Sequence, residues 1–381
     1  MIEYKIVKIT DLGTVNRGKS KHRPRNDSIL YGGKYPFIQT ADIKKANLYL
    51  SDYSQTYNEI GLKQSKLWKK GTLCFTIAAN IADSAILDID ACFPDSIVGF
   101  LPHENVSNTI YVKYLFDELK LYFQQISKGT TQDNLSLDKI CRVKLRVPNY
   151  ETQKKIALVL STYDNLIENN NKRIKLLEQM AENLYKEWFV RFRFPGYEEV
   201  AFENGIPKGW EVKKIKNCVK RLPFNQLYKR NELQLEGKVI VIDQSSAEFL
   251  GYHNNEPSHC ASIDKPILLF GDHSCKFVLM IRDFSLGENV VPFISENENK
   301  LNDYYLFYAV HKIIVTEEYK RHWGRFTAMK ILVPNYELQL TFANFIKPIV
   351  HEQNMLWNEN QLLTKQRNML LPRLMSGKLK V

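Results

Sequence analysis

Two long stretches of the chain place apolar residues at alternating spacings of four and three, which is the pattern of a helix with one apolar seam. The seam positions of the first stretch are Ile156, Leu160, Tyr163, Ile167, Asn170, Ile174, Leu177, Ala181, Leu184 and Trp188. Only Asn170 is polar. Asn149 or Thr152 can cap this helix, with Glu151 in its first turn, and Pro195-Gly196 ends the apolar run. The pattern predicts a helix of about 40 residues, roughly 60 Å long.

The second stretch repeats the first. Residues 147–151 (Val-Pro-Asn-Tyr-Glu) and Gln153 recur 186 residues later as residues 333–337 and Gln339. With this offset the second seam consists of Phe342, Ile346, Ile349, Gln353, Leu356, Asn360, Leu363, Arg367, Leu370 and Leu374. Each helix alone can simply pack on its own globular domain. Two seams of equal length can instead pair, with Asn170 serving register more than stability, and the duplication favours such an antiparallel pair.

The residues before each helix have the short alternating or apolar runs of β-strands, separated by turn residues. In the first part these runs are residues 4–9, 35–38, 72–78, 84–89 and 97–101, followed by a helical run at 112–126. In the second part they are residues 238–242, 266–270 and 277–281, followed by a helical run at 304–319. Trp210, Val212 and Ile215 match Tyr4, Ile6 and Ile9 at an offset of 206, so the second globule is about 20 residues shorter.

These patterns predict an α+β protein in which two related globules are separated by two long antiparallel helices. We expect the first globule at residues 1–146, a central helical spacer at 147–190, a connector at 191–207, the second globule at 208–332 and a C-terminal helical spacer at 333–381. The residues expected to pack the spacer helices are Ile156, Leu160, Tyr163, Ile167, Ile174, Leu177, Leu184, Ile349, Leu356, Leu363 and Leu370.

Composition adds a basic balance to this picture. The 381 residues include 53 Lys and Arg against 42 Asp and Glu, a formal net charge of +11, which favours a polyanionic partner. No run approaches 18 apolar residues, and the early Glu3 does not suit a signal peptide, so we expect a cytoplasmic protein without a membrane partner. The six cysteines lie far apart without a Cys-x-x-Cys pair, which indicates reduced thiols.

One segment concentrates the positive charge. Arg17, Lys19, Lys21, Arg23 and Arg25 place five cations within nine residues without an acid, and such a loop suits contact with phosphates. Residues 13–20 also satisfy the phosphate-loop pattern of nucleotide hydrolases. A phosphate loop must open a helix at its Lys-Ser, whereas the residues that follow here are charged and helix-breaking. We therefore interpret the segment as a basic loop.

Two further patterns suggest metal chemistry. Asp95, with Glu118 and Lys120, resembles the carboxylate and lysine set of metal-dependent nucleases, although Glu118 and Lys120 are expected on a helix. Soft ligands also gather in the second globule, with spacings that fit no usual zinc site: His253, His259, Cys260, His273 and Cys275. We expect no metal site on this chain. The absence of methyltransferase and hydrolase motifs favours recognition over catalysis.

The helical segments resemble a known family. Residues 153–171 and 177–196, the latter reading Leu-Glu-Gln-Met-Ala-Glu-Asn-Leu-Tyr-Lys-Glu-Trp-Phe onward, look like the central helical region of type I restriction enzyme specificity subunits. The tail at residues 370–379 resembles their C-terminal helical region. Residues 36–42, 129–136 and 270–274 look like parts of their target recognition domains, with a weaker correspondence.

The resemblance implies a non-catalytic subunit that reads a bipartite site on double-stranded DNA, one half per recognition domain. Its helices would dock two methyltransferase subunits, which bring S-adenosylmethionine, and motor-nuclease subunits using ATP and Mg²⁺ would join for restriction. No cofactor is expected on the chain itself. In the first domain the candidates for phosphate contact are Arg17, Lys19, Arg23 and Arg25, and those for base contact are Gln39, Thr131, Gln132 and Asn134. In the second domain the candidates for DNA contact are Lys229, Arg230, His273, Arg282, Arg321 and Arg325. The alternatives are a nuclease using Asp95, Glu118 and Lys120, or a DNA-binding architectural protein that acts alone.

Overall fold

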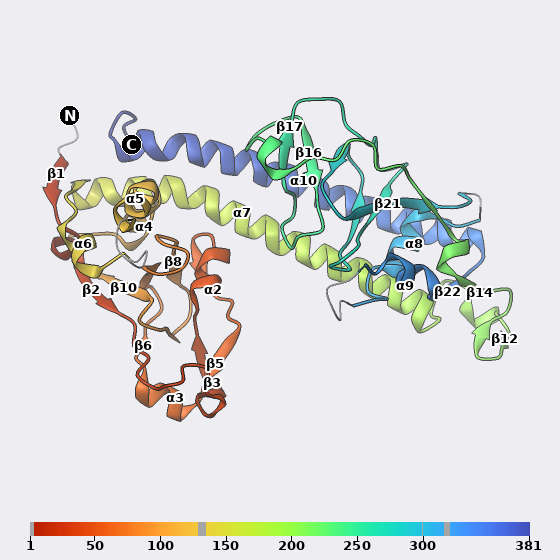
Figure 1. Cartoon of the computed structure of the whole chain (residues 1–381), viewed down its shortest axis with the longest axis horizontal. Coiled ribbons are helices and arrows are strands. Elements are labelled where there is room, and N and C mark those ends of the chain that lie inside the picture. Colours follow the sequence, from red (N-terminus) through yellow and green to blue (C-terminus); the bar gives the residue numbers. More distant parts are fainter. Residues whose placement is uncertain (1–3, 129–134, 299, 316–320) are drawn as a thin grey trace. The chain divides into compact units, whose positions relative to one another are not determined.

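The computed structural model describes residues 4–128, 135–298, 300–315 and 321–381. The chain forms two compact units. The first unit comprises Met1–Asn171 with Trp357–Val381, and the second comprises Lys172–Leu356. The two long helices, α7 (Tyr150–Tyr185) and α10 (Tyr336–Met375), both continue across this division (Figure 1). Each unit therefore contains one end of each long helix.

The first unit is built on two mixed sheets with the strand orders β2-β10-β7-β8-β4 and β5-β3-β9-β6, beside the antiparallel pair β1-β11. Its strands are β1 (Tyr4–Val7), β2 (Gly13–Arg17), β3 (Tyr31–Phe37), β4 (Tyr49–Leu50), β5 (Gln55–Tyr57), β6 (Leu67–Trp68), β7 (Leu73–Thr76), β8 (Ser84–Leu87), β9 (Ala91–Cys92), β10 (Ile97–Pro102) and β11 (Leu145–Pro148). Its shorter helices are α1 (Ile9–Leu12), η1 (Ser28–Leu30), α2 (Thr40–Lys45), α3 (Glu59–Gln64), α4 (Thr109–Glu118), α5 (Lys120–Ser127) and α6 (Leu137–Arg142).

The second unit has sheets with the orders β15-β21-β18-β19 and β17-β16-β20, and the pairs β14-β22 and β12-β13. Its strands are β12 (Phe202–Glu203), β13 (Ile206–Pro207), β14 (Glu211–Lys214), β15 (Val219–Arg221), β16 (Val239–Ile242), β17 (Gly251–His253), β18 (Ile267–Gly271), β19 (Phe277–Met280), β20 (Phe284–Leu286), β21 (Val290–Ser295) and β22 (Lys330–Val333). Its shorter helices are η2, a π-helical turn (Lys186–Val190), η3 (Tyr197–Glu199), η4 (Ile215–Asn217), η5 (Arg230–Glu232), α8 (Asp303–Val310) and α9 (Trp323–Ala328).

The strand pairing of the first unit recurs in the second. The order β2-β10-β7-β8 corresponds to β15-β21-β18-β19, and the antiparallel and parallel neighbours of β3 correspond to those of β16. The register agrees with the sequence offsets, because Lys5 pairs with Val147 and Glu211 pairs with Val333. The first partners are 206 residues apart and the second partners 186 apart. The duplication inferred from the sequence is therefore a duplication of topology.

A repeated glutamine explains part of the repeated motif. Gln153 is 1% exposed, and its Nε2 donates to the carbonyl of Pro148 at 3.0 Å while its Oε1 accepts the N–H of Asn108, the N-cap of α4, at 3.1 Å. Gln339 is fully buried and makes the same bonds, to the Pro334 carbonyl at 2.9 Å and from Asn302, the N-cap of α8, at 2.8 Å. Each glutamine therefore ties the first turn of a long helix to the start of the helix packed on its unit's sheet.

The two long helices run antiparallel within each unit. In the first unit Asn170 Nδ2 donates to Asn360 Oδ1 at 3.0 Å, and Asp164, earlier on α7, pairs with Arg367, later on α10. In the second unit Arg173 pairs with Glu352 at 2.6 Å. Asn149 Oδ1 accepts the N–H of Thr152 at 2.9 Å, so Asn149 is the cap of α7. Among the described residues, no helix is long and apolar enough to cross a membrane.

The seam residues pack in two ways. Ile156 and Leu160 belong to the core of the first unit, together with Leu374 from the end of α10, while Ile349 belongs to the core of the second unit. The helices therefore pair and also pack on the globules, so the two arrangements left open by the sequence occur together. Of the other predicted packing residues, Ile167 and Leu356 are buried. The rest are half-buried: Tyr163, Ile174, Leu177, Leu184, Leu363 and Leu370.

Two predicted helical runs differ from the structure. The run at 112–126 is two helices, α4 and α5, which meet at Leu119, where φ is −89° and ψ is 3°. In the run at 304–319, α8 ends at Val310 and residues 311–315 are not helical, while residues 316–319 lie outside the described part of the chain. Phe123 and Ile314 lie beyond the ends of α4 and α8 and are buried, so apolar periodicity continues past a helix end and overestimates the length of the helix.

Candidate nucleic-acid interface

The basic loop of the first unit follows β2, an edge strand of the larger sheet. Gly18 starts the loop where its backbone N–H donates to the Ile97 carbonyl at 2.8 Å. A Cβ on Gly18 would lie 2.2 Å from the carbonyl oxygen of Pro94, so only glycine fits this approach. The contacts of Gly18 therefore fix the backbone at the point where the chain leaves β2, just before Lys19 and Lys21.

The backbone amides of this loop point into the protein. Lys19 N–H donates to the Phe93 carbonyl at 3.0 Å, and the N–H groups of Lys21 and His22 donate to Gln64 Oε1 at 2.6 and 3.1 Å. A phosphate loop would instead turn its amides toward the phosphates and open a helix. The amides of Lys19, Lys21 and His22 are thus bonded within the protein, which agrees with the interpretation of this segment as a basic loop.

The five cations of the loop are all exposed, but they differ in their contacts. Arg23 Nη1 donates to the carbonyls of Ser20 and His22 at 2.9 and 2.8 Å, and Arg25 pairs with Asp95 at 2.9 Å. Within the described part of the chain, the side chains of three cations make no hydrogen bond or ion pair: Arg17, Lys19 and Lys21. These three have their charge available for an external anion. Lys21 was not among the candidates drawn from the sequence.

The candidates for base contact in the first unit are only partly described. Gln39 precedes α2, and its Nε2 donates to Gln55 Oε1 at 2.6 Å. It is half-buried, with its amide oriented by a neighbouring side chain. Thr131, Gln132 and Asn134 lie outside the described residues.

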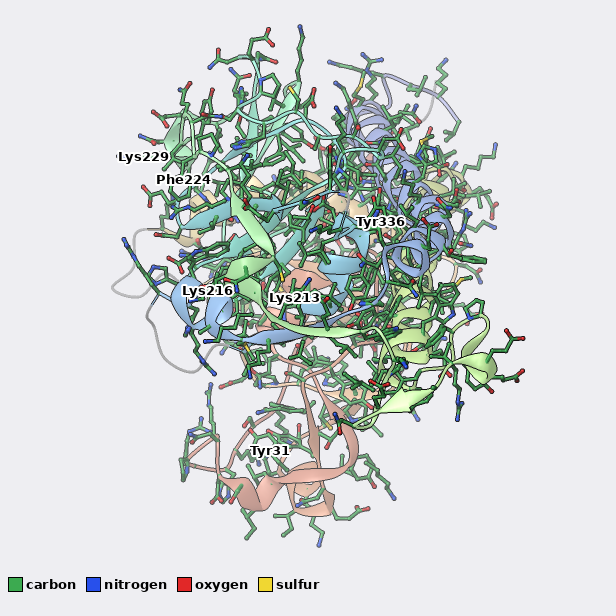
Figure 2. All side chains as sticks on the ribbon, turned by 90° about the vertical axis from the view of Figure 1, so that its right-hand side faces the viewer. Tyr31, Lys213, Lys216, Phe224, Lys229 and Tyr336 are labelled. Carbon is green, nitrogen blue, oxygen red and sulfur yellow. The ribbon has the colours of Figure 1, made fainter. Side chains whose placement is uncertain are left out.

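In the second unit, the loop after β15 corresponds in topology to the basic loop, because β15 corresponds to β2. Lys229 and Arg230 lie in this loop at the start of η5 and are exposed. Figure 2 labels Lys229. Arg221, at the end of β15, stacks its guanidinium over the Phe224 ring at 4.3 Å, a contact that the sequence analysis missed. This loop therefore also carries exposed cations, and one of them is oriented by an aromatic ring.

The other candidates of the second unit lie near the β18–β19 turn and α9. Arg321 is exposed and lies 4.0 Å from Asp272, and Arg325 is exposed on α9. Asp272 Oδ1 accepts the N–H groups of His322 and Trp323 at 3.0 and 2.8 Å, which ties the turn to the start of α9.

Two of these candidates are less accessible. His273 is half-buried, and its backbone N–H donates to Gln244 Oε1 at 3.0 Å. Arg282 is half-buried, and burial lowers the pKa of its guanidinium, opposed by Glu248. We therefore expect Arg321 and Arg325 to be reached by a large anionic partner more easily than these two.

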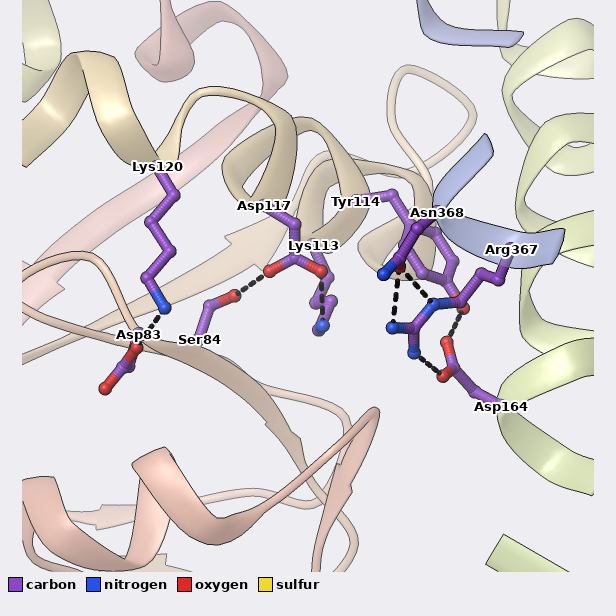
Figure 3. A network of polar contacts seen from close by, with 9 residues as sticks. All are labelled: Asp83, Ser84, Lys113, Tyr114, Asp117, Lys120, Asp164, Arg367 and Asn368. Atoms are coloured by element: carbon purple, nitrogen blue, oxygen red, sulfur yellow. Dashed lines mark hydrogen bonds and ion pairs between the residues drawn. The ribbon is translucent and has the colours of Figure 1, made fainter. Parts of the chain in front are cut away.

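A polar network in the first unit includes one residue of the nuclease alternative (Figure 3). Lys120 Nζ lies 2.5 Å from Asp83 Oδ1, while Ser84 Oγ and Lys113 Nζ both contact Asp117. Asp95 pairs with Arg25, and Glu118 is exposed at the end of α4. Asp95 and Lys120 thus form ion pairs with Arg25 and Asp83, whereas the nuclease pattern would require both side chains to face one metal site.

The histidines of the second unit contact other groups. His253 stacks on Tyr228 with ring centroids 4.1 Å apart, and its Nε2 lies 2.9 Å from Ser285 Oγ. His259 Nε2 lies 2.9 Å from the Pro223 carbonyl. Burial lowers the pKa of both imidazoles, which favours their neutral forms. Both rings act as packed polar groups of the sheet.

Comparison with known proteins gives a consistent result. Residues 1–179 match the family described as type I restriction modification DNA specificity domain. The MjaIX and MjaVIII specificity subunits of type I restriction enzymes from Methanocaldococcus jannaschii are each 26% identical to this chain. Both alignments cover 100% of this chain, and they cover 94% and 93% of the two relatives.

A solved structure shares the fold. The S subunit of a type I restriction-modification system from M. genitalium superposes with a TM-score of 0.58 at 13% identity, covering 98% of this chain and 96% of that one. The sequence relatives are named as specificity subunits of type I restriction enzymes. This chain is therefore similar to type I restriction enzyme specificity subunits over its full length, and residues 1–179 match their DNA specificity domain.

Proposed function

We propose that this chain reads a bipartite site on double-stranded DNA, with one half-site for each unit. The observation that carries the proposal is the repeated strand order, because two copies of one topology provide two readers of the same kind. The net charge of +11 and the exposed cations of both corresponding loops support an anionic partner. Phosphate contacts from these loops would position each unit, while polar side chains nearby would select bases.

The chain depends on partners for chemistry. Two methyltransferase subunits dock on α7 and α10 and bring S-adenosylmethionine for adenine methylation, and motor-nuclease subunits bring ATP and Mg²⁺ for restriction. The long helices set the separation of the two half-sites. The names of the relatives support such a complex, and we expect this chain in the cytoplasm with the DNA that it reads.

Methylation mapping tests the proposal. The chain is produced with its methyltransferase subunits, and methylated adenines are mapped across the genome; we expect a two-part motif with an unspecified gap. Gln39→Ala and Arg321→Ala should each relax a different half-site, by about 1–3 kcal/mol for a lost bidentate base contact. A continuous motif would contradict the two-reader proposal. DNA binding without any methylation would favour an architectural protein, and cleavage by the pure chain with Mg²⁺ would favour a nuclease.

A further inference from the structure

Gln64, the last residue of α3, holds the basic loop of the first unit. Its Oε1 accepts the backbone N–H of Lys21 at 2.6 Å and that of His22 at 3.1 Å. Backbone N–H groups are donors only, so the atom that faces them must be the amide oxygen rather than the nitrogen. One side-chain oxygen thus fixes two consecutive peptide groups that are more than 40 residues away in sequence.

The surroundings of Gln64 make this attachment rigid. Ser65 Oγ donates to the Lys19 carbonyl at 2.8 Å, so the end of α3 holds the loop at two places. The fully buried Tyr57 lies beside Gln64 and Ser20 and stacks on Phe37 with ring centroids 4.0 Å apart. The loop therefore packs against buried side chains, which restrict the motion of its backbone.

The side chains of Lys19 and Lys21 are on the exposed side of this loop. Their backbone groups are bound to Phe93, Ser65 and Gln64, whereas their ammonium groups make no hydrogen bond or ion pair with any described residue. A loop that is ordered before binding saves the entropy of ordering it on the DNA. The contacts thus separate two roles, one for the residues that hold the loop and one for the cations that it presents.

We propose that Gln64 is a positioning residue for DNA binding, which touches no nucleotide itself and holds residues 19–22 so that Lys19 and Lys21 reach phosphates. The inference rests on the proposed function, since it requires that the first unit binds DNA. The sequence identifies the basic loop only by its cations, and the proposal adds Gln64 as a neutral residue that holds this loop in place.

Salt dependence of binding provides the test. Each phosphate contact adds about 0.9 to the slope of log affinity against log salt concentration, and a neutral side chain adds nothing by itself. The full chain, in complex with its methyltransferase subunits, is titrated with mixed-sequence duplex DNA at several salt concentrations. Replacing both Lys19 and Lys21 by Ala should lower the slope by about two. Gln64→Leu should lower it by about one to two, with roughly 10-fold weaker binding, although no charge is removed.

Two controls make the result specific. Gln64→Glu keeps an acceptor for both amides, so it should lose less of the slope than Gln64→Leu does, even though its carboxylate adds a negative charge. Adding Gln64→Leu to the chain that lacks Lys19 and Lys21 should cause no further loss of slope, because the positioned cations are already gone. If Gln64→Leu does not fold, as judged by circular dichroism, Gln64→Asn replaces it, since its shorter side chain cannot reach the amides.

An unchanged slope in a folded Gln64→Leu or Gln64→Asn variant would overturn the positioning role. An equal loss of slope in Gln64→Leu and Gln64→Glu would also overturn it, because the loss would then not depend on the acceptor. If the unsubstituted complex shows no salt-dependent binding, the proposed function itself fails. The two failures are therefore distinguishable.

Discussion

Asp303 lies in the first turn of α8, where its Oδ1 accepts the backbone N–H of Ser295 at 2.6 Å. Burial raises the pKa of this carboxyl from 3.8 to about 6, with the Ser295 hydrogen bond acting in the opposite direction. The folded state therefore holds this proton more tightly than the unfolded state does. The resulting stability is fully present below pH 4 and is lost as the pH rises through about 6.

Because ionisation of Asp303 destabilises the folded state, we predict that Asp303→Asn stabilises the protein above the pKa of this carboxyl. The amide keeps an acceptor for Ser295 and carries no charge, so the variant should gain about 1–3 kcal/mol of unfolding free energy over the natural chain at pH 7.5 and almost nothing at about pH 3. Urea unfolding at both pH values measures the difference. Asp264→Asn is the control, because Asp264 is 76% exposed and pairs with Lys347 at the surface. A gain of equal size at both pH values would argue against titration of Asp303.

The cations of the basic loop show how far residue-level prediction from sequence reaches. The sequence identifies the loop, because five cations without an acid are a local pattern. It does not separate Arg25 from Lys19, since the partner of Arg25 is Asp95, 70 residues away. It also misses Gln64, which carries no charge and lies 42 residues from His22. Such pairings depend on the fold, so local composition contains no signal for them.

At the scale of elements, one ion pair between α7 and α10 differs from the others in its burial. The side chain of Asp164 is 1% exposed and contacts both Arg367 and the hydroxyl of Tyr114, which joins α7, α10 and α4 within the first unit (Figure 3). In the second unit, Arg173 and Glu352 pair with 52% and 44% of their side chains exposed. The two pairs bridge the same helices in very different surroundings.

Removing one partner should therefore have unequal effects. Arg367→Met leaves the carboxylate of Asp164 buried without its cation and should cost about 3–5 kcal/mol of unfolding free energy. Arg173→Met breaks an exposed pair and should cost less than about 1 kcal/mol. Thermal and urea unfolding of the two variants, compared with the natural chain, give the two values. Equal costs would show that burial of Asp164 does not control the strength of its pair.

The elements themselves follow from the sequence better than their contacts do. The strand runs correspond to β3, β7, β8 and β10 in the first unit, and the cap at Asn149 is one of the two predicted. Arg367 was placed in the second seam as a polar interruption, whereas Asp164 lies outside the first seam, so periodicity does not predict their pairing. Periodicity reports which side of a helix is buried; it does not report which charge the neighbouring helix presents.

At the scale of the whole molecule, the second unit is shorter than the first, and the offsets between corresponding residues show where it is shorter. The buried glutamines bind N-caps that are 194 residues apart, Asn108 and Asn302, while the first strands are offset by 206 and the long helices by 186. The shortening of the second unit therefore falls on both sides of the N-cap of α8. Within the described residues, the strand pairs of the larger sheet are kept except for the edge strand β4.

The proposed spacing role of the helices gives the last prediction. Four residues inserted after Asn171 in α7 and four after Leu356 in α10 add about 6 Å to each helix, or roughly two base-pair steps. Because both insertions fall at the division between the units, the Asn170–Asn360 and Arg173–Glu352 pairs keep their partners within each unit. Four residues slightly exceed one helical turn, so the seam keeps nearly the same face.

Methylation mapping of the complex that carries both insertions should show unchanged half-sites and a gap longer by one or two base pairs. Insertions of two residues in each helix should abolish methylation, because they rotate the following seam by about half a turn and separate the paired faces. The four-residue insertion in α7 alone is the intermediate case, since it lengthens one helix against an unchanged partner, and we expect weaker methylation with the same longer gap. An active four-residue variant with an unchanged gap, or with an altered half-site, would show that α7 and α10 do not set the spacing.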